Sequence, residues 1–239
     1  LLAENWEDVS WTSGKAEAFL VNTCSVTEHS DKKCRNIIRK LHRLNPSAPI
    51  VVTGCYAELR RDEILALDGV RAVFGAKETG SVVPCLLELG CQEATRSGKN
   101  PDRGGDCVGV HGGDFFAAYS SGDRTRSFLK VQDGCNNFCA YCIVPYVRGR
   151  ERSRDPQCVL QEVKELVEAG YKDITLLGQN VNSYGNDLNL GYDFADLLAD
   201  IDKIPGEYLI RFMSSHPKDA TKKLFDTMAA SKHVAKQLQ

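Results

Sequence analysis

The chain alternates short apolar runs with stretches of helical periodicity, and this order constrains its fold more than any other feature. In the first third, the apolar runs predict strands and the periodic stretches predict helices. The expected elements are a strand at 18–24, a helix at 25–44 capped by Thr27 or Ser30, a strand at 49–53, a helix at 62–67 and a strand at 70–74. This βαβαβ order favours a parallel sheet with helices on its faces.

A second α/β segment follows a stretch without periodicity. Residues 89–122 are rich in Gly, Asp, Ser and Arg, which predicts a linker. Beyond it we expect strands at 127–132, 174–177 and 208–213, and helices at 156–169, at 194–201 and from 221 onward. This order suits a (β/α) barrel or part of one. The sequence thus predicts an α/β protein, with a βαβ parallel-sheet domain at 1–88 and a partial barrel at 123–239.

Three cysteines, Cys135, Cys139 and Cys142, form a C-x3-C-x2-C pattern just after the strand expected at 127–132. Ten cysteines without a secretory signal indicate a reducing compartment, the cytoplasm, where clustered thiols bind metals or take part in catalysis. Three thiolates so close in sequence can hold one face of an iron–sulfur cubane and leave one iron open. Zinc usually takes four ligands, and no second cysteine pair follows nearby. The spacing therefore favours a cluster over zinc.

Two further cysteines, Cys24 and Cys55, each come directly after an expected strand. The carboxyl edge of a parallel sheet is where ligands bind, so both thiols can serve one metal site. Free cysteine is also a common core residue, and the pattern alone leaves that alternative open.

Among functional classes, charge and hydropathy exclude a membrane-spanning protein and leave nucleic-acid binding open. The net charge of −2 does not indicate a nucleic-acid partner, so such a partner would need a local basic patch. The candidates are four arginines within seven residues: Arg148, Arg150, Arg152 and Arg154. They can contact phosphates, or they can form an ordinary solvated run. There is no apolar run long enough for a transmembrane helix, and we expect no membrane association.

The three-cysteine loop resembles that of the radical S-adenosylmethionine (SAM) superfamily, with Tyr141 at the aromatic position of its C-x3-C-x-aromatic-C signature. Further segments are similar to the methylthiotransferase branch: 22–26, 53–57, 134–149, 176–184 and 214–217. The resemblance implies a [4Fe-4S] cluster on the three cysteines, SAM bound at its open iron, and Tyr141 against the adenine. It implies a radical SAM barrel as the second domain. It also brings Gln179, Asn180, Asn182 and Ser214 to the barrel mouth, where they would contact SAM. An ordinary Asn- and Gly-rich turn explains residues 180–185 equally well. His216 can likewise be either an ordinary loop residue or a residue that contacts the ligand.

The same resemblance implies a second [4Fe-4S] cluster held by three cysteines of the first domain, including Cys24 and Cys55. The family's first cysteine has no counterpart in residues 1–17, and its C-terminal RNA-binding domain is absent. We therefore expect a fragment shortened at both ends, in which Cys24 and Cys55 approach each other but hold the second cluster weakly or not at all.

The activity implied by the resemblance is methylthiolation of C2 of an N6-modified adenosine 37 in the tRNA anticodon loop. The barrel half looks more like enzymes acting on N6-isopentenyladenosine, and the N-terminal half more like those acting on N6-threonylcarbamoyladenosine. The first substrate is favoured, because the barrel surrounds the reacting base. Methylthiolation of a ribosomal-protein aspartate and a non-catalytic iron–sulfur or zinc module are the alternatives. An electron donor such as flavodoxin and a sulfur donor complete the expected partners.

Overall fold

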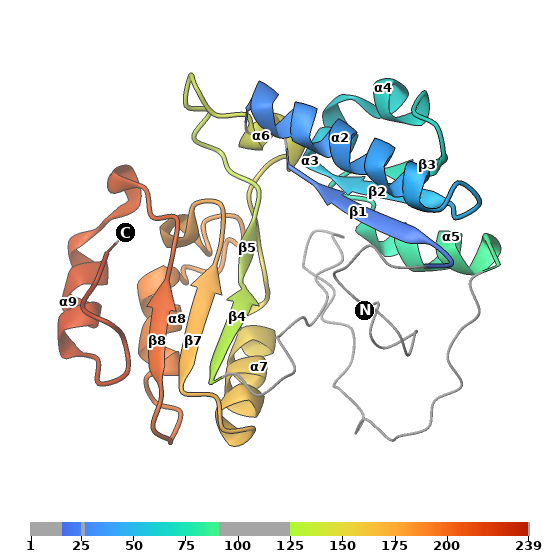
Figure 1. The fold of residues 1–239 in the computed structure, drawn as a ribbon. Coiled ribbons are helices and arrows are strands. Elements are labelled where there is room, and N and C mark those ends of the chain that lie inside the picture. Colours follow the sequence, from blue (N-terminus) through green and yellow to red (C-terminus); the bar gives the residue numbers. More distant parts are fainter. Residues whose placement is uncertain (1–15, 25–26, 91–124, 239) are drawn as a thin grey trace. The chain divides into compact units, whose positions relative to one another are not determined.

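The structure is a computed structural model, and it describes residues 16–24, 27–90 and 125–238. The chain divides into two compact units, 1–103 and 104–239, which are described separately below (Figure 1). The predicted linker lies almost wholly outside the described residues, so the domain limits at 88 and 123 stay predictions. In the part of the chain that the structure describes, every helix is too short or too polar to cross a membrane.

The first unit is built on a parallel sheet with strand order β1–β2–β3. Its elements are β1 (Phe19–Thr23), α2 (Glu28–Leu44), β2 (Ile50–Gly54), α3 (Cys55–Leu59), α4 (Arg61–Leu65), β3 (Val70–Phe74), η1 (Thr79–Ser81) and α5 (Val82–Glu88). The three expected strands and the parallel arrangement are confirmed. The sequence did not predict α3 or α5.

Helices cover both faces of this sheet because alternate strand residues point to opposite sides (Figure 1). Val52 belongs to the core that includes Ile38 of α2 and Ile64 of α4, whereas the adjacent Val51 packs with Val82 and Leu86 of α5. One of the two expected caps is confirmed, because the Thr27 hydroxyl accepts a hydrogen bond from the Ser30 backbone N–H at 3.2 Å and begins α2.

The second unit contains a parallel sheet with order β4–β7–β8 and a separate antiparallel pair, β5–β6. Its elements are β4 (Arg126–Lys130), β5 (Gln132–Asp133), α6 (Val144–Val147), β6 (Arg152–Ser153), α7 (Pro156–Glu168), β7 (Asp173–Leu177), η2 (Val181–Ser183), α8 (Phe194–Ile201), β8 (Leu209–Phe212), η3 (Pro217–Asp219) and α9 (Lys222–Ala230). The expected α/β order is confirmed. The prediction of a strand through 132 was wrong in one respect, because the chain leaves the sheet after Lys130 and pairs Gln132 with Ser153 instead.

The core of this unit lies between the sheet and its helices. Leu166 of α7, Leu198 of α8 and Leu224 of α9 pack in one cluster with Leu176 of β7 and Ile210 of β8. Beyond α9, Val234 makes a parallel bridge to Ile210, so the chain returns to the sheet edge next to β8. The helices α7 and α8 thus precede β7 and β8, and the parallel strands β4, β7 and β8 deliver their following loops to the same edge.

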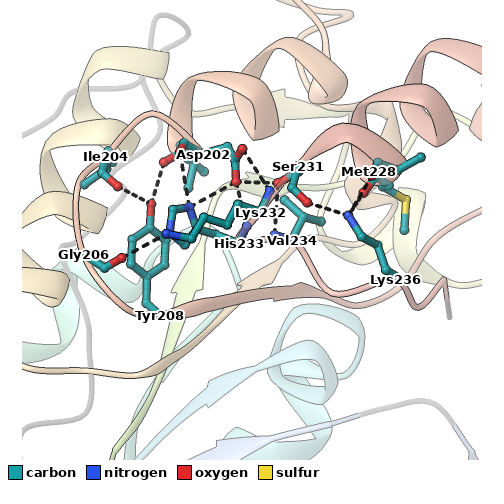
Figure 2. A network of polar contacts seen from close by, with 12 residues as sticks. Asp202, Ile204, Gly206, Tyr208, Met228, Ser231, Lys232, His233, Val234 and Lys236 are labelled. Carbon is teal, nitrogen blue, oxygen red and sulfur yellow. Dashed lines mark hydrogen bonds and ion pairs between the residues drawn. The ribbon is translucent and has the colours of Figure 1, made fainter.

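A polar network ties the opposite, amino edge together (Figure 2). The carboxylate of Asp202, which ends α8, accepts hydrogen bonds from the Ser231 hydroxyl at 2.5 Å and from the His233 backbone N–H at 2.7 Å. The His233 ring lies within 3.1 Å of the same carboxylate and 3.2 Å of the Gly206 carbonyl oxygen, and it stacks on Tyr208. Burial alone would raise the pKa of Asp202, but these donors lower it. The network fixes the turns that lead into β8 and into Val234.

Candidate metal centre

The three-cysteine loop is closed at its base by the β5–β6 pair. Cys135 begins the loop, and its backbone N–H donates to the Gly149 carbonyl at 3.2 Å. Directly before Cys135, Gly134 adopts φ +75° against the Gly149 and Arg150 carbonyls, where a Cβ atom would overlap both. Only glycine fits this close approach. The local sequence Gly134-Cys135 therefore brings the two ends of the loop together.

Within the loop, the three thiols are free and unequally exposed. Cys135 is buried, whereas Cys139 and Cys142 are half-buried. The loop turns through Phe138, which has an uncommon φ of +46°, and through a hydrogen bond from the Cys142 N–H to the Cys139 carbonyl at 2.9 Å. Burial raises the pKa of the Cys135 thiol, and the nearby charges of Glu151, Cys142 and Cys139 raise it further. Three free thiols therefore lie on one short loop.

This donor set fits an iron–sulfur cubane with one open iron. In the described part of the chain, no three His, Cys, Asp or Glu side chains gather around one point as the ligands of a single metal ion do. A cubane makes a different demand, because each thiolate binds a different iron. Three free cysteines on one loop, after a strand at the carboxyl edge, meet that demand and supply no fourth thiolate.

His216 joins this site from the loop after β8. Its Nε2 lies 3.8 Å from the Cys139 sulfur. Its backbone is held by the Asn182 amide, which accepts from the His216 N–H at 2.8 Å and donates to the His216 carbonyl at 2.9 Å. Both polar atoms of Asn182 are therefore used to hold the loop. Asn182 thus supports His216 in this site, and its own contact with a cofactor stays a prediction.

Other predicted cofactor contacts lie in the same loops. The backbone N–H groups of Gln179 and Asn180 both donate to the Gln132 side-chain oxygen, at 2.7 and 3.3 Å. The Asn180 amide nitrogen donates to Asp219 at 2.7 Å, and its oxygen is buried without a partner among the described residues. Ser214 is exposed at φ +66°, and its carbonyl accepts from the Val181 N–H. The structure gathers these residues at the carboxyl edge, and their contacts with a cofactor stay predictions.

Glu151 is a buried acid beside the loop. Its carboxyl accepts a hydrogen bond from the Ser183 hydroxyl at 2.6 Å, and its backbone N–H donates to the Asn136 side chain at 3.2 Å. The second carboxyl oxygen has no partner in the described part of the chain. Burial raises the pKa of Glu151 to about 7, with the charges of Asp187 and Asp219 adding to the effect. This residue connects the cysteine loop with the loop after β7.

Replacing Glu151 with Gln should change how the stability of the cluster-free chain depends on pH. The raised pKa means that the folded chain holds a proton on Glu151 that the unfolded chain releases, so wild-type stability falls as pH rises from about 4.5 to about 7. Glu151→Gln should remove this fall, and urea unfolding at several pH values measures it. Glu168→Gln, on an exposed part of α7, is the matched control. Parallel curves for wild type and Glu151→Gln would contradict the assignment.

Two of the four predicted phosphate-binding arginines are held by a buried carboxylate. Asp133 of β5 pairs with Arg148 at 3.2 Å, with Arg152 at 3.5 Å and with Lys130 at 2.6 Å. Burial alone would raise the pKa of Asp133, but these three cations lower it below its ordinary value. Arg148 and Arg152 thus brace the base of the cysteine loop.

The remaining two arginines lie in opposite environments. Arg154 is buried and pairs with Glu162 of α7 at 2.6 Å, so its guanidinium belongs to the core and not to a phosphate-binding surface. Arg150 is exposed, and its guanidinium lies over the Phe138 ring at 4.5 Å. Of the four, Arg150 is the one for which the described residues provide no carboxylate partner.

Exposed aromatic side chains lie on the same loop as Arg150, and one of them, Phe138, contacts its guanidinium. Tyr141 is 90% exposed, Tyr146 is 67% exposed and Phe138 is 40% exposed. Phe138 and Tyr146 make an edge-to-face contact with ring centroids 5.7 Å apart. Large exposed aromatic side chains next to a cation are typical of binding surfaces.

In the first unit, Cys24 and Cys55 follow paired residues on adjacent parallel strands. Thr23 of β1 is in register with Gly54 of β2, so each cysteine is the next residue along its strand. The Cys34 thiol of α2 lies 3.8 Å from the Cys24 carbonyl oxygen. The register agrees with the expectation that Cys24 and Cys55 meet at one edge, and their ligand role stays a prediction.

Sequence reasoning missed three residues that organise this site: Gln132, Asp133 and Glu151. All three are polar side chains that the fold buries, which usually marks a required hydrogen bond, but no local pattern in the sequence sets them apart. The partners come from distant segments, such as Gln132 with Gln179. Only the tertiary structure reveals these pairs.

Comparison with known proteins adds independent information. Residues 1–75 match the model of "Uncharacterized protein family UPF0004", and residues 129–235 match the radical SAM superfamily. A tRNA-2-methylthio-N(6)-dimethylallyladenosine synthase of Desulfitobacterium hafniense is 40% identical over 233 residues, which cover 94% of this chain and 50% of that protein. The threonylcarbamoyladenosine tRNA methylthiotransferase MtaB of Bacillus subtilis is 37% identical over 225 residues, covering 93% and 48%. The chain spans about half the length of the curated relatives it matches.

The radical SAM methyltransferase TsrM of Kitasatospora setae, solved with cobalamin and a [4Fe-4S] cluster, aligns with a TM-score of 0.48 and 17% identity. The alignment covers 92% of this chain and 57% of TsrM.

Proposed function

The chain belongs to the radical SAM methylthiotransferase family, and from that premise we propose that it is part of an enzyme that methylthiolates C2 of an N6-modified adenosine 37 in tRNA. The observation that carries the proposal is the loop of three free cysteines, closed by β5–β6 and carried to the carboxyl edge of a parallel sheet. The relatives that match nearly the whole chain are named for this class of reaction on tRNA.

Cys135, Cys139 and Cys142 would hold a [4Fe-4S] cluster, with SAM at the open iron. Together the two cofactors supply radical chemistry able to break an unactivated C–H bond. The chain's own residues would bind and orient these cofactors. Asn180 offers a buried amide oxygen without a partner among the described residues, and Tyr141 offers an exposed ring. Gln179, Asn182 and Ser214 shape the same rim, and Glu151 joins two of its loops.

Reconstitution with iron and sulfide tests the assignment. We expect about four irons per chain at the three-cysteine loop, and reductive cleavage of SAM to 5′-deoxyadenosine. Stoichiometric zinc and no SAM cleavage would favour the non-catalytic module. A stable count near eight would mean that a residue besides Cys24 and Cys55 completes a second cluster in the first unit.

The N6 modification of the substrate is the finer part of the proposal. We favour N6-isopentenyladenosine because the barrel half, which would surround the reacting base, resembles the enzymes that act on it. Identity does not separate the two classes, since relatives named for dimethylallyladenosine are 36–40% identical and the threonylcarbamoyladenosine enzyme is 37% identical. Mass spectrometry of tRNA nucleosides from a deletion strain separates the two. The enzyme would also need a low-potential electron donor such as flavodoxin and a sulfur donor, and it would work in the cytoplasm, where tRNA is modified.

Contact with RNA would centre on Arg150, Phe138 and Tyr146. The Phe138 ring holds one face of the Arg150 guanidinium at 4.5 Å, which leaves the N–H edges free to meet a phosphate. The Tyr146 ring is 67% exposed and can stack on an unpaired base, as aromatic side chains do in single-stranded RNA recognition. This surface is on the cysteine loop itself, so a bound anticodon loop would lie near the reacting cofactors.

Arg150→Ala should weaken binding of an anticodon stem-loop and lower its salt dependence. Losing one phosphate contact should reduce the slope of log K against log salt by about 0.7 to 0.9. Fluorescence anisotropy at several salt concentrations measures both quantities. Lys222→Ala, an exposed cation on α9, is the control and should behave as wild type. An unchanged slope in Arg150→Ala would exclude this residue as a phosphate contact.

A further inference from the structure

The His216 backbone is held rigidly at the candidate metal centre. The Asn182 side chain clamps it with two hydrogen bonds, 2.8 Å from Oδ1 and 2.9 Å from Nδ2. Asn182 itself is buried, with 7% of its surface exposed. The clamp therefore determines where the imidazole begins.

A second contact determines which ring nitrogen carries the proton. His216 caps the short helix η3, and its Nδ1 accepts a hydrogen bond from the Lys218 backbone N–H at 3.2 Å. A backbone N–H can only donate, so Nδ1 must be the unprotonated nitrogen of the neutral ring. The single ring proton therefore lies on Nε2.

That proton faces a cysteine of the three-cysteine loop. Nε2 is 3.8 Å from the Cys139 sulfur, which is within the reach of a hydrogen bond to sulfur. When Cys139 binds iron it does so as a thiolate, which is an acceptor only. The direction of the bond then follows from the two fixed partners: Lys218 donates to Nδ1, and Nε2–H donates to Cys139.

We propose that His216 is a positioning residue that donates an Nε2–H hydrogen bond to the Cys139 sulfur and thereby raises the reduction potential of the cluster. The inference rests on the proposed function, because it needs the cluster. Hydrogen bonds to the sulfurs are among the features that set iron–sulfur potentials. One-electron reduction adds negative charge to the cluster, and a donor beside a ligating sulfur stabilises that charge. The electron comes from an external low-potential donor.

Two substitutions separate the donor from the helix cap. Asn at position 216 keeps an oxygen near the place of Nδ1, so it can cap η3 as asparagine commonly does, but its amide is too short to reach Cys139. Gln at position 216 carries its amide nitrogen near the place of Nε2, so it keeps a donor toward the sulfur and weakens the cap. His216→Ala loses both.

Redox titration monitored by electron paramagnetic resonance, without SAM or RNA, gives the readout. We expect His216→Ala and His216→Asn to disfavour cluster reduction about tenfold relative to wild type, which corresponds to a potential about 59 mV more negative. His216→Gln should lie close to wild type. Iron content measured on each variant shows whether the cluster loads equally.

Two results would overturn this inference and leave the proposed function standing. Equal potentials in all four proteins, at equal iron content, would show that His216 does not act on the cluster. A wild-type potential in His216→Asn with a shifted one in His216→Gln would show that the cap matters and the donor does not. A wild-type chain that assembles no cluster on the three cysteines would instead refute the proposed function, and this inference with it.

Discussion

Cys139→Ala should lose reductive cleavage of SAM altogether, with no 5′-deoxyadenosine above background. The cubane needs three thiolates from this loop, and within residues 125–238 no further free cysteine is described that could replace one. His216 is near Cys139, but its ring is turned by the Lys218 contact so that a proton, and not a lone pair, faces the site. Iron content and the spectrum of the reduced cluster measure the loss directly, independently of turnover.

The matched control for this change is Cys85→Ala. Cys85 lies on α5 of the first unit and packs against the hydrophobic side chains of Val51, Val82 and Leu86. Its substitution should leave iron content and SAM cleavage unchanged. Cys135→Ala and Cys142→Ala should match Cys139→Ala. Retained 5′-deoxyadenosine formation in any of the three would refute the ligand assignment for that residue.

Arg154→Ala should destabilise the second unit by about 3 to 5 kcal/mol, because it leaves a buried carboxylate without its cation. Both side chains of the pair with Glu162 are nearly inaccessible, and the guanidinium also donates to the Lys130 carbonyl at 3.0 Å. Burial raises the pKa of Glu162, and the charge of Arg154 opposes that rise. Without Arg154, Glu162 should take up a proton when the chain folds.

Urea unfolding followed by circular dichroism tests this, with Arg150→Ala as the control. Arg150 is exposed, and its loss should cost no more than about 0.5 kcal/mol. The double variant Arg154→Met, Glu162→Leu should recover most of the loss, because it removes both buried charges together. If Arg154→Ala unfolds with the same midpoint as Arg150→Ala, the buried pair contributes nothing to stability.

The sequence predicted the larger elements because each leaves a periodic signal. β3 was expected at the residues it occupies, and the expected helix at 156–169 is α7 at 156–168. The shorter elements escaped for a physical reason. β5 and β6 have two residues each and consist of polar side chains, so neither alternation nor hydrophobicity marks them. Their pairing depends on the closure of the loop between them.

The candidate site divides in the same way. The spacing of Cys135, Cys139 and Cys142 is local and was readable directly. The sequence did not predict that Arg150 is exposed and Arg154 is buried. Four arginines in one run give the same sequence signal whether they lie in the core or on the surface. Burial of Arg154 depends on Glu162 of α7, which is eight residues away and faces it only after the helix has packed. The role of His216 likewise depends on Asn182, 34 residues earlier.

The Asp202–His233 network has a consequence for how such a protein can diverge. It fastens the turns that enter β8 and the following bridge at Val234, whereas the cysteine loop and the loops after β7 and β8 all leave from the other ends of the strands. Residues that hold the sheet together and residues that meet a substrate are therefore separated by the length of a strand. Substitutions in the rim loops can therefore alter what the site accepts without loosening the turns that anchor the sheet.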